Sequence, residues 1–456
     1  MRKHSYGAMR LKESAEIVPD ELFVQRLWFE NLYKDSLKTT DGRTILIRNP
    51  GFWNRGAGPD FLNAALEVEG MTLQGPIEIH MTPDGFQAHG HDKDPAYRDL
   101  VLHIVWTRGL SGTAPENRRG QPIPVVELSG QLKVPLSEAK SCFAATTQEL
   151  EVGARVGRCH KTLATMSDDE VVRLVEEAGW FRFHQRAARW RMKSRRGIEI
   201  PDDEWLWQGL AEVLGYSKNR EAMVHVAQVL PISEIQKHDD LTREALLFGI
   251  SGWMCEPAPK SLSQHVRKLW DVWWQYRGHY PEMPTKTWKL SGIRPVNRPE
   301  RRLAALVYCS RRRVFDELRQ ALAESDGKKA KAVLLKATHE EWDYRFSLKG
   351  KVSAKANRLI GSDKCDAFLF NVFWPLAHRH DPGQVEDEIR KMTTSYDSLA
   401  ARRARVRLLE NMDWKGFKNR LLAVEGLLQI YRDFCLEDRS SCGQCEFPEW
   451  IQQWRA

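Results

Sequence analysis

Three residues on two neighbouring extended segments have the types and spacing of a divalent-metal site. Asp60 follows a Gly-Pro turn, and Glu78 and His80 lie two apart in the next apolar run. Residues two apart in a strand point to the same face, so we expect Glu78 and His80 to stand side by side. Asp60, at the start of the preceding strand of a predicted hairpin, reaches the same place. Two carboxylates and a base form a minimal site for Mg²⁺ or Mn²⁺ in phosphodiester hydrolysis, with Asp60 and Glu78 as the metal ligands.

A histidine-rich loop follows these two segments. His89 and His91 flank a glycine, Asp92 and Asp94 come next, and the following predicted strand carries His103. Such spacing is typical of zinc sites, but the stretch lacks the further histidine of the metallo-β-lactamase pattern. We therefore expect His89, His91 and Asp92 to rim the carboxylate site and to contact phosphate or a second metal ion. The alternative is a polar, glycine-hinged loop without a ligand.

A cysteine group lies near the end of the chain. Cys435, Cys442 and Cys445 need one further thiolate to complete a four-cysteine site, which is compatible with zinc or with a [4Fe–4S] cluster. Cys159 is the preferred fourth ligand because it lies in a polar segment that reads as non-helical. Three incidental cysteines are the alternative. The other candidates for the fourth ligand are Cys142, Cys255, Cys309 and Cys365.

Two groups of basic residues alternate with aromatic residues at helical spacing. The aromatic side chains are expected to face the core, and the basic faces could track a nucleic-acid backbone. Solvated helix faces are the alternative interpretation. The residues chosen as nucleic-acid ligands are Arg186, Arg189, Lys193, Arg301 and Arg302.

The order of elements predicts two domains. Residues 1–18 are expected to be a flexible lead, and residues 19–135 combine a helix with a small mixed sheet, an α/β order. Residues 136–164 are expected to be a linker, and residues 165–456 read as an all-α domain with tryptophans filling its core. On the first helix, Glu21 and Glu30 are both candidates for a further carboxylate at the rim; helix geometry does not choose between them.

Composition narrows the class of protein. The chain has 456 residues, 42% of them apolar, and a formal net charge of +8, which permits an anionic partner such as nucleic acid. The basic N-terminus has no apolar core typical of a signal peptide, and no apolar run is long enough to span a bilayer. Eight cysteines without a signal peptide suggest a reducing compartment, so we expect a cytoplasmic protein.

Several long segments carry a resemblance. Residues 37–68, 75–106, 293–307 and 359–377, together with the C-x₆-C-x₂-C tail, resemble the bacterial family catalogued as domain of unknown function 2851. The Pro59-Asp60 and Glu78-Ile79-His80 pair is similar to the PD-(D/E)xK nuclease core, with His in place of Lys. That resemblance implies a restriction-endonuclease-like fold. The cysteine group also resembles nucleases in which a four-cysteine iron–sulfur cluster joins the ends of the nuclease domain, although here all four cysteines follow the core strands.

The resulting hypothesis is a metal-dependent nuclease, or a nuclease-derived protein that processes nucleic acid, with DNA favoured over RNA. Asp60, Glu78 and His80 would form its centre. Because His is only partly protonated near neutrality, its replacement of Lys favours an alternative, a catalytically inactive nuclease fold that binds nucleic acid or protein. A hydrolase of small phosphorylated substrates is a third interpretation.

Overall fold

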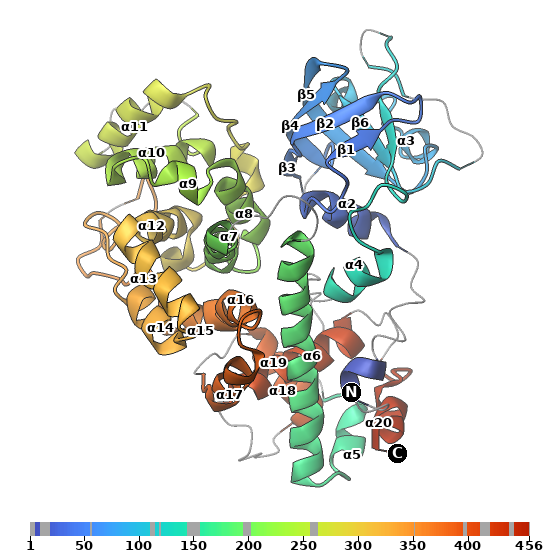
Figure 1. Ribbon diagram of the computed structural model, residues 1–456, viewed down its shortest axis with the longest axis vertical. Helices are drawn as coiled ribbons and strands as arrows, with labels where there is room; N and C mark the ends of the chain where they lie inside the picture. The colour runs from blue at the N-terminus through green and yellow to red at the C-terminus, as the bar shows by residue number, and fades with distance from the viewer. Residues whose placement is uncertain are drawn as a thin grey trace.

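The computed structural model arranges an α/β domain and two helical lobes along one long helix, α6 (Asp168–Ser194) (Figure 1). The described residues are 5–9, 19–54, 57–109, 115–117, 120–143, 156–194, 202–255, 263–350, 352–394, 399–410, 420–436 and 442–455.

The α/β domain begins with helix α2 (Glu21–Phe29), whose first turn is capped by the Asp20 carboxylate accepting from the Phe23 amide at 2.8 Å. A mixed sheet follows, with strand order β1-β2-β4-β5-β6-β7 and β3 paired to β4. The pairs from β1 to β5 are antiparallel, and β5-β6 and β6-β7 are parallel. The strands are β1 (Ser36–Lys38), β2 (Thr44–Asn49), β3 (Phe52–Trp53), β4 (Phe61–Val68), β5 (Met71–His80), β6 (Leu102–Val105) and β7 (Val125–Glu127).

Alternation along β5 separates the core from the chemistry. Ile77 and Ile79 are fully buried in one core with helix α2, so the intervening Glu78 and His80 point to the other side. The crossover between β5 and β6 covers that side with helix α3 (Gly85–Ala88) and a short 3₁₀ turn, η1 (Pro95–Tyr97).

After β7 the regular elements of the described chain are all helices, joined by turns and loops. The larger lobe has a tryptophan-rich core, as the sequence predicts: Trp205, Trp207, Trp273, Trp342 and Trp374 are all buried. Its helices are α7 (Asp202–Leu214), α8 (Arg220–Val229), α9 (Ile232–Ile235), α10 (Asp240–Ile250), α11 (Gln264–Tyr276), α12 (Pro299–Ser310), α13 (Arg312–Ala323), α14 (Gly327–Leu335), α15 (Ser362–Phe368), α16 (Trp374–Ala377) and α17 (Pro382–Lys391), with short turns η2 (Thr285–Thr287), η3 (Pro295–Asn297) and η4 (Leu369–Phe373).

A smaller lobe surrounds the N-terminal half of α6 and corrects two expected boundaries. Tyr6, from the expected flexible lead, is buried there, and its hydroxyl donates to Asp433 at 2.6 Å. The expected linker contains two helices, α4 and α5, because part of it packs onto α6 and onto the C-terminal helices. The elements of this lobe and its neighbourhood are α4 (Leu136–Phe143), α5 (Cys159–Leu163), α18 (Leu399–Leu409), α19 (Leu421–Tyr431), η5 (Arg432–Leu436) and α20 (Phe447–Arg455).

Helices α6 and α19 cross with their backbones almost in contact. A Cβ atom added to Gly426 would lie 1.9 Å from the carbonyl oxygen of Val175, and one added to Gly179 would lie 2.3 Å from that of Leu422. Glycine at both positions therefore permits the crossing. Among the described helices, none is both long enough and apolar enough to cross a membrane.

Candidate metal centre

The pairing of β4 with β5 brings the two predicted carboxylates together. Phe61 lies opposite Ile77, so Asp60 comes next to Glu78. The Asp60 amide donates to Glu78 Oε2 at 2.9 Å, and the Ile79 amide donates to Asp60 Oδ2 at 3.0 Å. Gln25 of helix α2 donates to the other oxygen of Asp60 at 2.8 Å. Backbone and side-chain donors thus hold both carboxyl groups in fixed orientations.

Three imidazoles gather beside Glu78. One ring nitrogen from each of His80, His89 and His91 lies within 4.8 Å of the others, a spacing suited to one shared metal ion. Glu78 Oε1 lies 3.2 Å from His91 Nε2 and 3.7 Å from His80 Nε2. The structure therefore places the loop histidines and the strand residues of the sequence prediction in one group.

Helix α3 positions the loop by lying directly on the His80 ring. A Cβ atom added to Gly85 would come within 2.7 Å of His80 Cδ2, so glycine at the start of α3 permits this approach. The helix ends at His89, whose amide donates to the Gly85 carbonyl at 3.0 Å. His91 then stacks on Tyr97 of η1, with ring centroids 3.9 Å apart. The crossover thus brings His91 to Glu78 and His89 to His80, whose Nε2 lies 3.2 Å from His89 Nδ1.

A fourth histidine lies behind the group. His103 of β6 is fully buried and pairs in register with Glu78 in β5, and its Nε2 lies 3.0 Å from His80 Nδ1. When His80 Nδ1 carries the proton and donates to His103, the Nε2 lone pair of His80 faces His89 Nδ1, 3.2 Å away, and a metal ion bound between them would take the place of that hydrogen bond. His103 Nδ1 is buried and has no hydrogen-bond partner among the described residues.

Burial shifts the pKa values of several residues at the site. It raises the pKa of Asp60 to about 7 and that of Glu78 to about 9, where the nearby charge of Asp60 adds to the effect. Burial and the neighbouring imidazoles lower the pKa of His80 to about 3, and burial followed by His91 lowers that of His103 to about 4. Neutral imidazoles are ready metal ligands, and a cation would relieve the repulsion between the carboxylates.

The donor set fits a transition-metal ion better than Mg²⁺. Imidazole nitrogens beside a carboxylate suit Mn²⁺, Fe²⁺ or Zn²⁺, whereas Mg²⁺ prefers oxygen ligands. The predicted Asp60/Glu78 pair supplies only part of the available donors, because the alternating strand and the crossover add His80, His89 and His91.

The additional carboxylate from helix α2 is Glu21, and the prediction of Glu30 at the rim is wrong. Glu21 is close enough to Asp60 and Glu78 to contribute to raising their pKa values. Glu30, nine residues further along, forms an ion pair at 2.7 Å with Arg189 of the helical region. At about 1.5 Å per residue the two ends of the helix face different surroundings. Asp92 is exposed on the loop.

Most of the predicted nucleic-acid ligands are not on an open face. Arg189 is buried between the carboxylates of Glu30 and Glu212, 2.7 and 2.9 Å away. Arg301 and Arg302 are buried and donate to backbone carbonyls, including those of Asn357 and Leu359, both at 2.6 Å. The prediction of a phosphate-binding face is therefore wrong for these three arginines, because long-range packing uses their guanidinium groups. Arg186 is also buried, and the Lys193 side chain lies outside the described part.

Cys159 lies in the same buried cluster as Cys435 and Cys445, but among the described residues no three of the four thiols have their sulfur atoms all within 4.8 Å of one another. Burial raises the pKa of Cys159 to about 12, with further contributions from Cys435, Cys445 and Cys442. The Arg158 amide donates to Cys442 Sγ at 3.3 Å. Cys159 begins helix α5, contrary to the expected non-helical segment. Cys255 is exposed, Cys309 and Cys365 are buried elsewhere, and the Cys142 side chain lies outside the described part.

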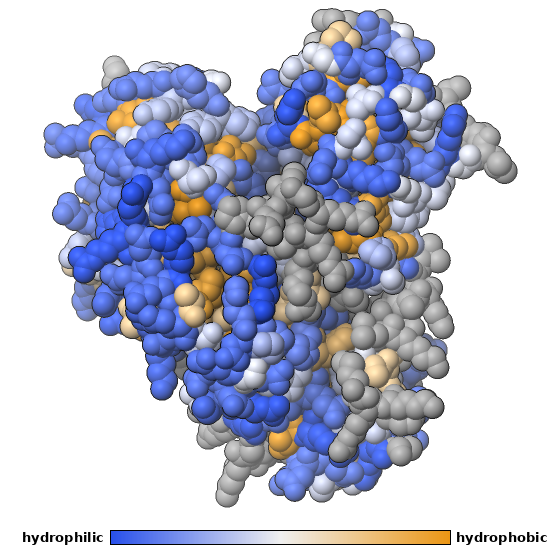
Figure 2. Space-filling model, viewed as in Figure 1, coloured by the Kyte–Doolittle hydropathy of each residue, from blue (hydrophilic) through white to orange (hydrophobic). Residues whose placement is uncertain are grey.

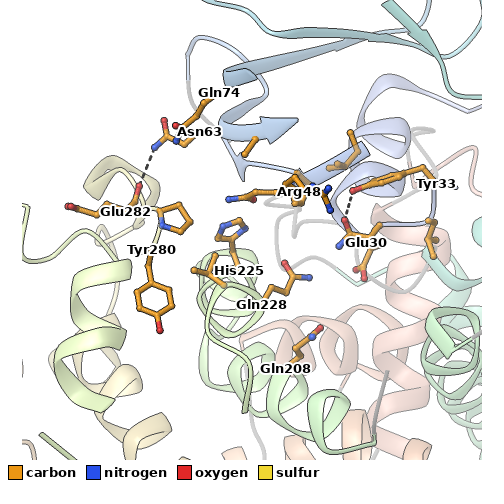
Figure 3. A pocket seen from close by; sticks show the side chains of 18 of the residues that line it. Glu30, Tyr33, Arg48, Asn63, Gln74, Gln208, His225, Gln228, Tyr280 and Glu282 are labelled. Carbon is orange, nitrogen blue, oxygen red and sulfur yellow. Dashed lines mark hydrogen bonds between the residues drawn. The ribbon is translucent and has the colours of Figure 1, made fainter. Parts of the chain in front are cut away.

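A cavity of about 1010 Å³ lies between the α/β domain and the larger helical lobe and shares no lining residue with the metal centre. The space-filling view shows a notch between these two parts (Figure 2). Polar side chains from both sides point into the cavity (Figure 3). Asn63 of β4 donates to the Glu282 carbonyl at 3.2 Å, and His225 of α8 is buried against Phe52. This cavity lies at the interface of the two parts of the chain. Its described lining residues include no group of side chains placed to hold a metal ion.

Sequence reasoning did not assign roles to Gln25, Tyr97 or His103. Gln25 lies one turn after Glu21 on the same face of α2. This helical spacing is the signal that would have placed Gln25 at the site. His103 lies at register with Glu78 only because β6 runs parallel to β5, and local sequence does not encode that pairing.

One family model matches residues 21–403, which is most of the chain, and its description reads "Protein of unknown function (DUF2851)". No curated protein and no solved structure matches the chain. The geometry of the site is therefore the basis for inferring function.

Proposed function

Because the chain belongs to the DUF2851 family, whose description names no activity, we propose its function from the metal centre: a divalent-metal-dependent phosphodiesterase that acts on nucleic acid. One observation carries the proposal. The carboxylate of Glu78 lies between Asp60 and three imidazoles, with Glu78 Oε1 3.2 Å from His91 Nε2. Neutral imidazoles and closely placed carboxylates favour a bound cation over an empty site.

The residues divide into ligands and positioning groups. Glu78, His80, His89 and His91 would hold the cation, with Asp60 as a further carboxylate at its edge. A bound divalent cation polarises a phosphate oxygen and makes water more acidic. His103 fixes the tautomer of His80, and the Ile79 amide holds Asp60 in place.

The arrangement of the sheet supports a PD-(D/E)xK-like core. Antiparallel strands β2, β4 and β5 follow helix α2, and a crossover then leads to β6, parallel to β5. Asp60 precedes the second of these strands, and Glu78 lies two residues before the end of the third. His80 takes the place of the lysine in that pattern. Since His80 is buried and its pKa is lowered to about 3, it would serve as a metal ligand and not as a cation that stabilises developing charge.

The choice of nucleic acid as substrate rests on the net charge of +8 and on the similarity of the core pattern to PD-(D/E)xK nucleases. A second candidate, a catalytically inactive fold that binds nucleic acid or protein, is favoured by the neutral His80 and by Asp60, both of whose oxygens already accept hydrogen bonds.

A cleavage assay separates these candidates. Labelled single- and double-stranded DNA and RNA would be incubated with Mn²⁺, Zn²⁺, Mg²⁺ or EDTA. We expect Mn²⁺- or Zn²⁺-dependent cleavage that is lost in Asp60→Asn and Glu78→Gln and kept in Asp169→Asn, at an exposed carboxylate on helix α6. Equal cleavage by wild type and Glu78→Gln would refute the phosphodiesterase. Binding of nucleic acid without cleavage would favour the inactive fold.

We also propose a structural metal at the four cysteines. Two chain segments separated by most of the helical region meet there, and none of Cys159, Cys435, Cys442 and Cys445 forms a disulfide. The Arg158 amide supplies a hydrogen bond to Cys442 Sγ of the kind that stabilises thiolate ligands. Both zinc and a [4Fe–4S] cluster accept four thiolates.

A further inference from the structure

A second cavity, of about 840 Å³, lies where helices α6, α7, α15 and α19 meet. Its wall carries eight arginine or lysine residues and four carboxylate residues. It shares no lining residue with the metal centre. The excess of basic residues makes the cavity electropositive. How strongly positive it is depends on which cations the four carboxylates pair with.

At least three of the four carboxylates already have cationic partners. Glu425 binds Arg182 at 2.6 Å. Glu212 binds Arg189, which is outside the cavity wall, at 2.9 Å. Asp366 pairs with Lys331, which also lies outside the wall. Because Glu212 and Asp366 pair with cations outside the wall, the eight basic residues of the wall outnumber the carboxylates that neutralise them.

Arg186 is the clearest of these cations. It is 7% exposed, and it makes no hydrogen bond or ion pair with any residue that the structure describes. Burial, followed by the charge of Arg182, lowers the pKa of Arg186, and the nearby carboxylates of Glu425 and Glu212 only partly offset this. A buried charge without a partner is costly, so such a group is retained where something else supplies the opposite charge.

Lys364 faces the same cavity from helix α15. Its ammonium lies 3.4 Å from the centroid of the Tyr216 ring, and it has no carboxylate partner within the described ranges. Burial, followed by the charges of Arg220 and Arg302, lowers the pKa of Lys364 to about 7, and the neighbouring Asp363 acts in the opposite direction. Among the described residues, neither Arg186 nor Lys364 forms a direct ion pair with the carboxylates that line this concavity.

We propose that this cavity binds a phosphate monoester through Arg186 and Lys364. A phosphate monoester is close to a dianion at neutral pH and matches two uncompensated cations, whereas one carboxylate supplies half that charge. Guanidinium groups present paired donors that fit phosphate oxygens. The volume suits a small ligand or the end of a strand. Two sources share this chemistry: a free nucleotide and the phosphorylated end of a nucleic acid.

Calorimetry with four probes tests the proposal: inorganic phosphate, a nucleoside 5′-monophosphate, and one oligonucleotide carrying either a 5′-phosphate or a 5′-hydroxyl. We expect saturable binding of phosphate-bearing probes. Arg186→Met and Lys364→Met should each weaken it by about tenfold or more, and Lys364→Arg should restore it. Arg313→Met, at a side chain of helix α13 that is 92% exposed, is the matched control. Preference for the nucleotide or for the phosphorylated oligonucleotide identifies the source.

The melting temperature of the ligand-free protein gives a second measurement. Arg186→Met should leave it unchanged or raise it, because the substitution removes an unpaired buried charge. Absence of phosphate binding in the wild type, or binding in both Met variants as tight as in the wild type, would overturn the proposal. So would weaker binding accompanied by a lowered melting temperature in both, which would assign the residues to the fold. The assay needs no cleavage, so its result is independent of the proposed phosphodiesterase.

Discussion

The backbone amide of Asp60 donates to the carboxylate of Glu78 at 2.9 Å, across the pairing of strands β4 and β5. This bond engages Glu78 Oε2 and leaves Oε1 toward His91, 3.2 Å away. The hairpin therefore does more than bring two acids together. It orients one oxygen of Glu78 toward the imidazoles of the crossover loop.

His103 should act as a positioning residue for His80. We expect His103→Leu to lower the affinity for Mn²⁺ or Zn²⁺ by about 10- to 100-fold, the range typical of partners that orient a ligand. His103→Asn should recover part of the loss, because its amide can accept from His80 Nδ1. Titration calorimetry measures both variants, with circular dichroism to establish folding. Unchanged affinity in His103→Leu would remove this role.

A buried ionic group in the larger lobe should control the pH dependence of stability. Glu244 is 1% exposed and accepts from His265, His339 and Trp342 at 3.0, 3.1 and 2.6 Å. Burial alone would raise the pKa of Glu244, but the histidine hydrogen bonds lower it to about 2. The bond to Glu244 outweighs burial and raises the pKa of His265 above 6.5.

The pKa shifts of Glu244 and His265 define a pH range in which this group stabilises the fold most. Stability from Glu244 is fully present above its ordinary pKa of 4.5 and is lost as pH falls through about 2. Stability from His265 is fully present below 6.5 and is lost as pH rises through its raised pKa. Glu244→Gln should therefore cost most between these limits, on the order of 3 kcal/mol. Denaturant unfolding of both proteins across pH measures the difference; a pH-independent cost would contradict the assignment.

The crossing of α6 and α19 should not tolerate a side chain at Gly426. Because a Cβ atom there would lie 1.9 Å from the Val175 carbonyl oxygen, Gly426→Ala should destabilise the protein by about 1–3 kcal/mol or more. Gly383→Ala, on helix α17, is the control, since its Cβ would meet nothing closer than 3.8 Å. Equal unfolding midpoints for the two variants would show that the crossing can separate freely.

The sequence pattern predicted which residues share a face of a strand or helix, but not which distant residues that face contacts in the fold. The period of two along residues 77–80 correctly separated Ile77 and Ile79 from Glu78 and His80, because strand alternation is local. It could not choose Glu21 over Glu30, since helix periodicity does not specify which neighbour each end meets.

The arginines show the same limit. Basic and aromatic residues at helical spacing suggested an exposed cationic face. The burial of Arg189 depends on Glu30, which is far away in the sequence and joins it only when the domains pack. The buried side of an amphipathic pattern can therefore carry charge when another part of the chain supplies its partner.

The cysteine group should hold a metal in the protein as purified. Elemental analysis should find zinc or iron, and visible absorbance would distinguish an iron–sulfur cluster from zinc. Cys159→Ala should lose the metal and lower the melting temperature, since the ligands join separate segments of the small lobe. Cys255→Ala, at an exposed thiol elsewhere, should retain it. Protein that contains neither metal and keeps its stability in Cys159→Ala would contradict the proposal.

The most direct test of the metal centre is titration of the purified protein with Mn²⁺ and Zn²⁺ by calorimetry. We predict binding that Glu78→Gln weakens by more than the roughly 10- to 100-fold expected of a positioning residue. Asp169→Asn, at an exposed carboxylate on helix α6, should bind as the wild type does. If the wild type binds neither ion, or if Glu78→Gln binds with unchanged affinity, the histidines and carboxylates around Glu78 do not form a metal centre.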